Sequence, residues 1–171
     1  HKTENMVKKQ PNQTVSLIAT NNDAITYLKM GELNESYSLL SEAVASLQKM
    51  IREDQLPKST PVRPNFQWTD LTDSNADYVF KSSNQSFVPF HFQRCLTVDM
   101  PRKREIRDNN LCPFGLCLIL DYNLALVAHI LGVQKEEYGR SYLQEAKVLY
   151  GMVSAHLQSR RCSADYIVLL M

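Results

Sequence analysis

The stretch Leu116-Cys-Leu-Ile-Leu-Asp-Tyr-Asn-Leu-Ala-Leu-Val-Ala-His-Ile-Leu131, followed by Gly132, is apolar along almost its whole length and contains neither Pro nor Gly. This length and composition predict a helix that is covered on every side. A polar turn, 133–137, separates it from residues 138–157, whose apolar side chains recur at helical spacing. Two helices joined by so short a turn fold back on each other as an antiparallel hairpin.

The same arrangement is predicted near the beginning of the chain. Apolar residues at helical spacing indicate a helix that ends at Gly31, a residue suited to a left-handed C-cap. A second amphipathic pattern runs from Asn34 to Ile51, with Asn34 as the expected N-cap and Glu35 in the first turn. Ser163 is the expected cap of one more helix, over 164–171. The sequence therefore predicts an all-α protein built from antiparallel hairpins.

A different composition separates the two hairpins. Residues 54–113 contain six of the seven prolines, a density that excludes long helices. Two aromatic and β-branched runs, 77–82 and 87–98, flank the turn-like residues 83–86 and predict a small β-hairpin. The expected organisation is an N-terminal tail at 1–13, a first hairpin at 14–53, a Pro-rich insertion at 54–113, a second hairpin at 114–158 and the start of a further helix at 159–171. We expect the chain to continue beyond that point.

Small residues recur at matching positions in the two hairpins. Ala24 stands seven residues before Gly31, and Ala125 stands seven residues before Gly132. Three further residues follow each glycine, and the intervals among them are the same in both hairpins. The distance from the glycine to the first of them is two residues longer in the second hairpin. These residues are Ser36, Leu40 and Ala43 in the first hairpin, and Gly139, Leu143 and Ala146 in the second. Small side chains at such positions allow two helices to cross closely.

This spacing resembles the tetratricopeptide repeat, a helical hairpin of about 34 residues. The resemblance covers residues 17–50 and 119–153. The amino-acid sequences of 122–132 and 143–150 are also similar to those of tetratricopeptide-like proteins common in diatoms and related algae. The family Trp and the closing Pro are missing, and a long insertion separates the copies. The alternative is a pair of unrelated hairpins in another all-α domain.

The resemblance implies a right-handed superhelix whose first helices line a concave groove for a partner segment. Only Lys29 could supply positive charge there, so a peptide carboxylate is not the expected ligand. The apolar second set indicates that the groove is already filled by the insertion, a third hairpin or a partner protein. The groove residues implied are Asn21, Asn22, Ile25, Leu28, Lys29, Tyr122, Asn123, Leu126, His129 and Ile130.

Chemistry-bearing residues are few and do not form a recognisable active site. His91, Cys95, Cys112 and Cys117 could in principle hold zinc, but neither pair has the common C-x2-C spacing, and we expect core or surface thiols instead. His129 is expected to be a hydrogen-bonded core or groove residue. Asp121 is expected to be a solvent-facing or helix-capping carboxylate. With only five glycines and no phosphate loop, the sequence predicts no catalytic, cofactor-binding or metal site.

Charge and hydropathy exclude several further classes of protein. Nineteen basic and eighteen acidic residues leave a formal net charge of +1, so nothing global indicates a nucleic-acid coat. Four cysteines in a chain of this length favour reduced thiols in an intracellular compartment. Residues 111–133 are long enough to span a membrane, but Asp121 and Asn123 near the middle favour a buried central helix, and we expect no membrane span.

These observations predict a non-catalytic scaffold or structural subunit that binds a protein partner through the repeat groove and the insertion. Aromatic residues and Arg are typical anchors of interfaces. The expected contacts in the insertion are Trp68, Phe90, Phe92, Arg102, Lys103, Arg104 and Arg107. The alternative is a nucleic-acid-associated subunit in which the basic run at 102–107 contacts phosphates. A solvated loop is the simpler interpretation of that run.

Overall fold

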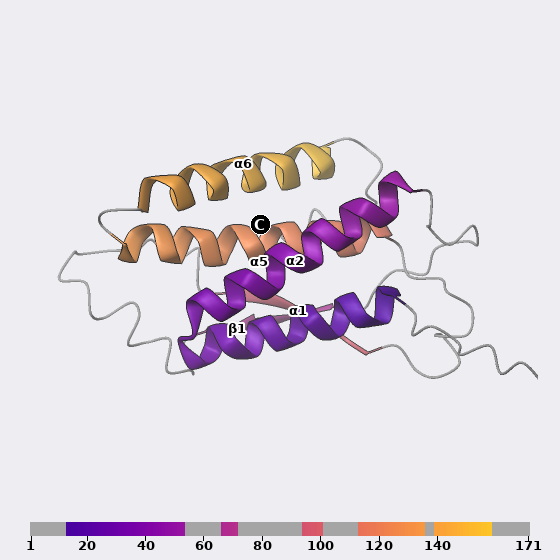
Figure 1. The fold of residues 1–171 in the computed structure, drawn as a ribbon, viewed down its shortest axis with the longest axis horizontal. Helices are drawn as coiled ribbons and strands as arrows, with labels where there is room; N and C mark the ends of the chain where they lie inside the picture. The colour runs from indigo at the N-terminus through magenta and orange to yellow at the C-terminus, as the bar shows by residue number, and fades with distance from the viewer. Residues whose placement is uncertain (1–12, 54–65, 72–93, 101–112, 136–138, 159–171) are drawn as a thin grey trace, which may run out of the picture.

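The computed structural model describes residues 13–53, 66–71, 94–100, 113–135 and 139–158. The protein is mainly helical, with a two-stranded sheet in the insertion (Figure 1). Its elements are α1 (Gln13–Met30), α2 (Leu33–Arg52), β1 (Phe66–Asp70), β2 (Arg94–Val98), α5 (Pro113–Gln134) and α6 (Gly139–Gln158). A mainly helical chain with a little β structure in the insertion was predicted, and this is confirmed.

Several predictions fall outside the described residues. These are the tail before α1, the run 77–82, the turn 83–86 and the further helix at 164–171.

The turn between α1 and α2 depends on one glycine. Gly31 has a φ of 84°, which an L side chain rarely adopts, and its N–H donates to the carbonyl oxygen of Leu28 at 3.1 Å. This confirms the predicted left-handed cap. Asn34, in contrast, is not the N-cap of α2, because the helix already begins at Leu33 and Glu32 occupies that position without a side-chain capping bond. The Asn34 side chain instead accepts a hydrogen bond from Nζ of Lys135 at 2.9 Å.

The turn between α5 and α6 uses glycine for a different purpose. The prediction that α5 ends at Gly132 was wrong, since the helix continues to Gln134. A Cβ on Gly132 would lie 2.6 Å from Cγ of Leu143, and a Cβ on Gly139 would overlap the carbonyl oxygen of Gly132. The two glycines therefore permit close contact between α5 and α6, which is the packing role that the repeat spacing predicts for small residues.

Helix α5 is the centre of the fold. It lies between α6 and the α1–α2 hairpin (Figure 1), and nearly all of its described side chains are buried. Five residues that the repeat spacing places in the core are indeed buried: Leu17, Ala24, Ala43, Ala125 and Ala146. By length and composition alone, Gly115–Gln134 could cross a membrane, but 83% of its most apolar window is buried by the rest of the protein.

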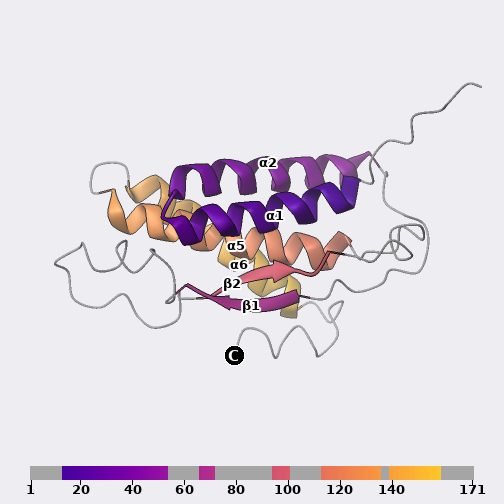
Figure 2. The same cartoon turned by 90° about the horizontal axis from the view of Figure 1, so that it is seen from below.

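The sheet packs against the helices through one strand. β1 and β2 are antiparallel, with Trp68 opposite Leu96, and β2 lies between β1 and the helices α1 and α5 (Figure 2). Residues 94–98 of the predicted run 87–98 form β2 and pair with β1, whereas the predicted pairing of 77–82 lies outside the described residues. Both strands had been assigned to the insertion, but 66–70 had not been recognised as a strand.

Candidate functional site

Three asparagines from two helices hold the backbone of β2. Asn123 of α5 accepts from the N–H of Leu96 at 2.9 Å and donates to the carbonyl oxygen of the same residue at 2.7 Å. Asn22 of α1 brackets Val98 in the same way, at 3.0 Å and 2.7 Å. Asn21 donates to the Leu96 carbonyl at 3.0 Å. We call Asn21, Asn22 and Asn123 the asparagine clamp.

The asparagine clamp takes the place of a third strand. A carboxamide carries one acceptor and one donor group in the geometry of a peptide unit, so it can satisfy both backbone groups of one residue. The amides also bond to each other, from Nδ2 of Asn123 to Oδ1 of Asn21 at 2.8 Å and from Nδ2 of Asn21 to Oδ1 of Asn22 at 3.2 Å. Because Asn21 and Asn123 are fully buried, the connected network is needed to keep their polar groups paired.

Next to the asparagine clamp, aromatic rings connect the sheet to the second hairpin. The Tyr122 hydroxyl donates to the carbonyl oxygen of Arg94 at 3.1 Å, and its ring lies 5.7 Å from that of Trp68, edge to face. Tyr150 of α6 follows at 6.2 Å from Tyr122, and His129 lies 6.3 Å from Tyr150. We call these four residues the aromatic row. Burial raises the pKa of Tyr122 to about 12, so its hydroxyl stays protonated and remains a donor.

The structure places the predicted groove residues in two groups. Asn21, Asn22, Tyr122 and Asn123 all bind β2, so the faces of α1 and α5 that carry them contact a segment of the chain itself. β2 belongs to the insertion, which is one of the three occupants expected for the groove. A second group, Ile25, Leu28, Leu126 and Ile130, is buried in the core and presents no surface to a partner. Lys29 and His129 are half-buried.

The predicted contacts of the insertion are described only in part. Trp68 lies on β1 within the aromatic row, whereas Phe90, Phe92, Arg102, Lys103, Arg104 and Arg107 fall outside the described residues. Sequence reasoning had not included Tyr150, which was assigned only to the buried face of its helix. The sequence signal that could have identified Tyr150 is an aromatic residue on the buried face of α6, opposite Tyr122 in the antiparallel hairpin.

Asp121 does not face solvent, as had been expected, but is fully buried. The reason is that α5 is covered on every side, so a polar residue on it has no exposed face to occupy. The Cys117 thiol donates to Oδ2 of Asp121 at 3.3 Å, while Oδ1 has no hydrogen-bond partner among the described residues. Burial raises the pKa of this carboxyl, and the Cys117 bond and the charge of His156 oppose the shift. The protein therefore contains one poorly compensated acid at its centre.

Asp121 makes the stability of the protein depend on pH. Because its pKa in the folded protein is raised, the folded state binds a proton that the unfolded state has released, and stability is lost as the pH rises through the folded pKa. We expect the free energy of unfolding of the wild type to fall relative to that of Asp121→Asn as the pH rises from about 4 towards neutral. Urea titrations over this range measure the difference.

Asp23→Asn, which removes an exposed carboxylate from α1, controls for the loss of one formal charge. A constant difference between wild type and Asp121→Asn at all pH values would contradict the assignment.

Burial favours the neutral forms of Cys95, Cys117 and His129. Burial raises the pKa of Cys95 and of Cys117 to about 12, which makes both poor nucleophiles and poor metal ligands at neutral pH. Burial lowers the pKa of His129. In the part of the chain that the structure describes, no three His, Cys, Asp or Glu side chains gather as they would around a metal ion. His91 and Cys112 lie outside that part.

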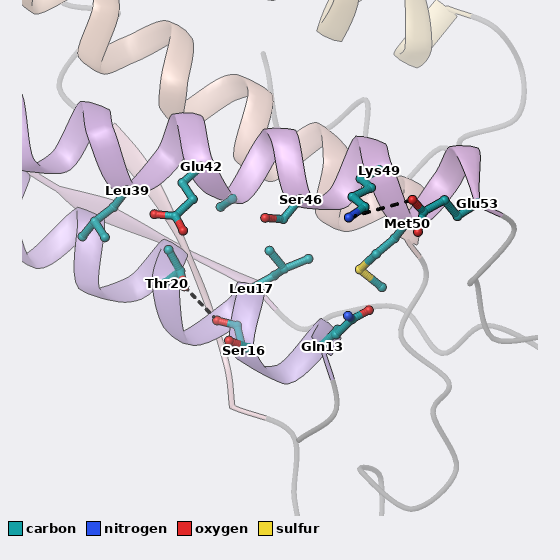
Figure 3. A pocket seen from close by; sticks show the side chains of 11 residues that line it. Gln13, Ser16, Leu17, Thr20, Leu39, Glu42, Ser46, Lys49, Met50 and Glu53 are labelled. Carbon is teal, nitrogen blue, oxygen red and sulfur yellow. Dashed lines mark hydrogen bonds and ion pairs between the residues drawn. The ribbon is translucent and has the colours of Figure 1, made fainter. Parts of the chain in front are cut away.

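A hollow of about 420 Å³ lies between the first turns of α1 and the last turns of α2 (Figure 3). Its floor includes Leu17 and Met50, while its rim is polar and includes the Lys49–Glu53 ion pair at 3.9 Å. None of the predicted groove residues lines it, and neither does any residue of the asparagine clamp. The hollow is thus separate from the site described above.

Comparison with known proteins identifies no relative. No protein-family model, no curated protein and no solved structure matches this chain.

Proposed function

We propose that this protein is a non-catalytic scaffold of the tetratricopeptide-like kind, which binds a protein partner on the concave side of its helical hairpins. The observation that supports the proposal most directly is the asparagine clamp, in which side chains of α1 and α5 hold an extended segment through its backbone. Two hairpins with small residues at matching crossing points support the repeat architecture.

The insertion changes which surface is offered to the partner. Since β2 fills the space beside the asparagine clamp, a partner meets the sheet and the aromatic row instead of the bare helices. Trp68 is half-buried there and contacts Tyr122 edge to face, and Gln67 and Asp70 are exposed on the same strand. Tryptophan is the residue type most enriched among interface anchors, so Trp68 is the expected centre of the contact.

Affinity capture with matched variants tests this proposal. We expect Trp68→Ala to reduce recovery of the bound protein partner about tenfold or more, as is usual for an interface anchor. Gln67→Arg should have the same direction of effect, because it adds bulk and charge to the exposed side of β1 without touching the core. Val148→Ala, on the solvent side of α6 at 51% exposure, is the control and should leave recovery unchanged.

Circular dichroism of each variant separates lost binding from lost folding. Equal recovery with all three variants would contradict the proposal. Capture of nucleic acid that is lost steeply with salt would instead favour the alternative contact through residues 102–107, which the structure does not describe.

A further inference from the structure

The helices hold β2 through its backbone and not through its side chains. The hydrogen bonds from the asparagine clamp end on the N–H and C=O groups of Leu96 and Val98, and the bond from Tyr122 ends on the C=O group of Arg94. Every residue except proline carries the same two backbone groups, so these bonds do not depend on the identity of the strand's side chains. The faces of α1 and α5 that carry the clamp thus have the hydrogen-bonding properties of a site for an extended peptide.

The side chains of β2 show which peptides this site accepts. Leu96 and Val98 lie two residues apart, so they point to the same side of the strand, and both are buried in the core. Arg94 at the beginning of the strand and Asp99 after its end are exposed. The site therefore favours an extended segment with aliphatic side chains at two alternate positions and polar residues at both ends.

The sheet itself adds only modest support to β2. Each strand has five residues, and an isolated two-stranded hairpin is marginally stable in water. The Asp70–Arg94 ion pair between the strands is more than half exposed on both sides, so it contributes little. Mainly the clamp and the burial of Leu96 and Val98 keep β2 in place, and a peptide from another molecule would make the same interactions.

We propose that an extended peptide of a partner protein takes the place of β2 in the asparagine clamp, and that β2 is an internal competitor for this site. The ligand class is an extended segment with aliphatic residues at the positions of Leu96 and Val98. This inference rests on the proposed function, because it requires that a partner binds at the clamp, and it adds the chemistry of the partner's bound segment.

Competition with β2 determines how tightly such a peptide binds. A segment tethered within the same chain competes at an effective concentration on the order of millimolar. The apparent dissociation constant of the external peptide equals its intrinsic value divided by the fraction of molecules in which the site is free. A substitution that weakens β2 and leaves α1 and α5 unchanged should accordingly strengthen binding of the external peptide.

Fluorescence anisotropy tests this expected gain of binding. The probe is a peptide with the sequence of residues 94–100 and Cys95→Ala, labelled at its N-terminus. We expect full-length Leu96→Ala to bind it at least tenfold more tightly than the wild type, because the loss of the buried leucine weakens β2 alone. Val153→Ala, at a buried position of α6, is the matched control and should leave the affinity unchanged. Circular dichroism confirms folding, and Val98→Ala, a smaller truncation with the same expected direction, replaces Leu96→Ala if that variant does not fold.

A second peptide tests recognition of the backbone. Methylation of the Leu96 nitrogen in the probe removes the N–H that donates to Oδ1 of Asn123 and keeps every side chain. We expect this peptide to bind the Leu96→Ala protein at least tenfold more weakly than the unmethylated probe. Equal binding of the two peptides would overturn the proposal, and so would equal binding of the probe by the wild type and Leu96→Ala.

The two proposals fail in different ways. If Trp68→Ala reduced recovery of the partner while no variant bound the probe, the exchange of β2 would be overturned and the proposed function would stand. If the probe bound as expected while Trp68→Ala left recovery unchanged, the exchange of β2 would be supported and the contact at Trp68 contradicted.

Discussion

Asn123→Asp is expected to destabilise the protein by about 3–5 kcal/mol at neutral pH, the usual cost of breaking a buried polar network. The carboxylate is nearly isosteric with the amide and can still accept from the N–H of Leu96. It cannot donate, however, to the Leu96 carbonyl at 2.7 Å or to Oδ1 of Asn21 at 2.8 Å, so lone pairs would face each other in a fully buried place. The strand β2 would lose its attachment to α5.

Urea unfolding followed by circular dichroism measures this loss. Asn34→Ala is the matched control, since Asn34 also bonds a residue far along the chain, Lys135, but does so on the surface. We expect the control to cost less than about 0.5 kcal/mol. Similar losses for the two substitutions would show that the asparagine clamp contributes no more than a surface contact.

Gly139→Ala is the second change with a large expected effect. The added Cβ would overlap the carbonyl oxygen of Gly132, which is backbone and cannot turn aside as a side chain can. Relief requires α5 and α6 to move apart at their turn, and we expect a loss of about 3 kcal/mol or more in the free energy of unfolding. Thermal and urea unfolding of the purified variant would measure it.

Gly151→Ala on the same helix is the control for Gly139→Ala. A Cβ at Gly151 meets nothing within 4 Å. We expect this substitution to stabilise the protein by about 0.5–1 kcal/mol, because alanine is more favourable than glycine at an exposed position inside a helix. If both glycines responded alike, the close crossing of α5 and α6 would not be the reason for glycine at 139.

The sequence alone determined the features that depend on local periodicity and on backbone freedom. Apolar spacing located the four described helices to within a few residues, because the buried face of a helix repeats along the chain. Gly31 was placed correctly because the left-handed backbone conformation of a C-cap favours glycine, which has no Cβ. The small residues of the two hairpins, Ala24 and Ala125 among them, could also be found from the sequence, because the close packing that requires them occurs within one hairpin.

Only the tertiary structure decided which distant segments meet. Leu96 pairs with Trp68, twenty-eight positions earlier, and its other edge bonds to side chains of α1 and α5 instead of a strand. The family resemblance placed Asn21, Asn22 and Asn123 together, but no local pattern identified 66–70 as the strand that pairs with β2. Asp121 was expected to face solvent or to act as a cap although its helix was expected to be buried, because an ionisable side chain is rarely buried without a charged partner. Long-range pairing depends on loop closure and packing among all elements at once, and no local repeat in the sequence records that balance.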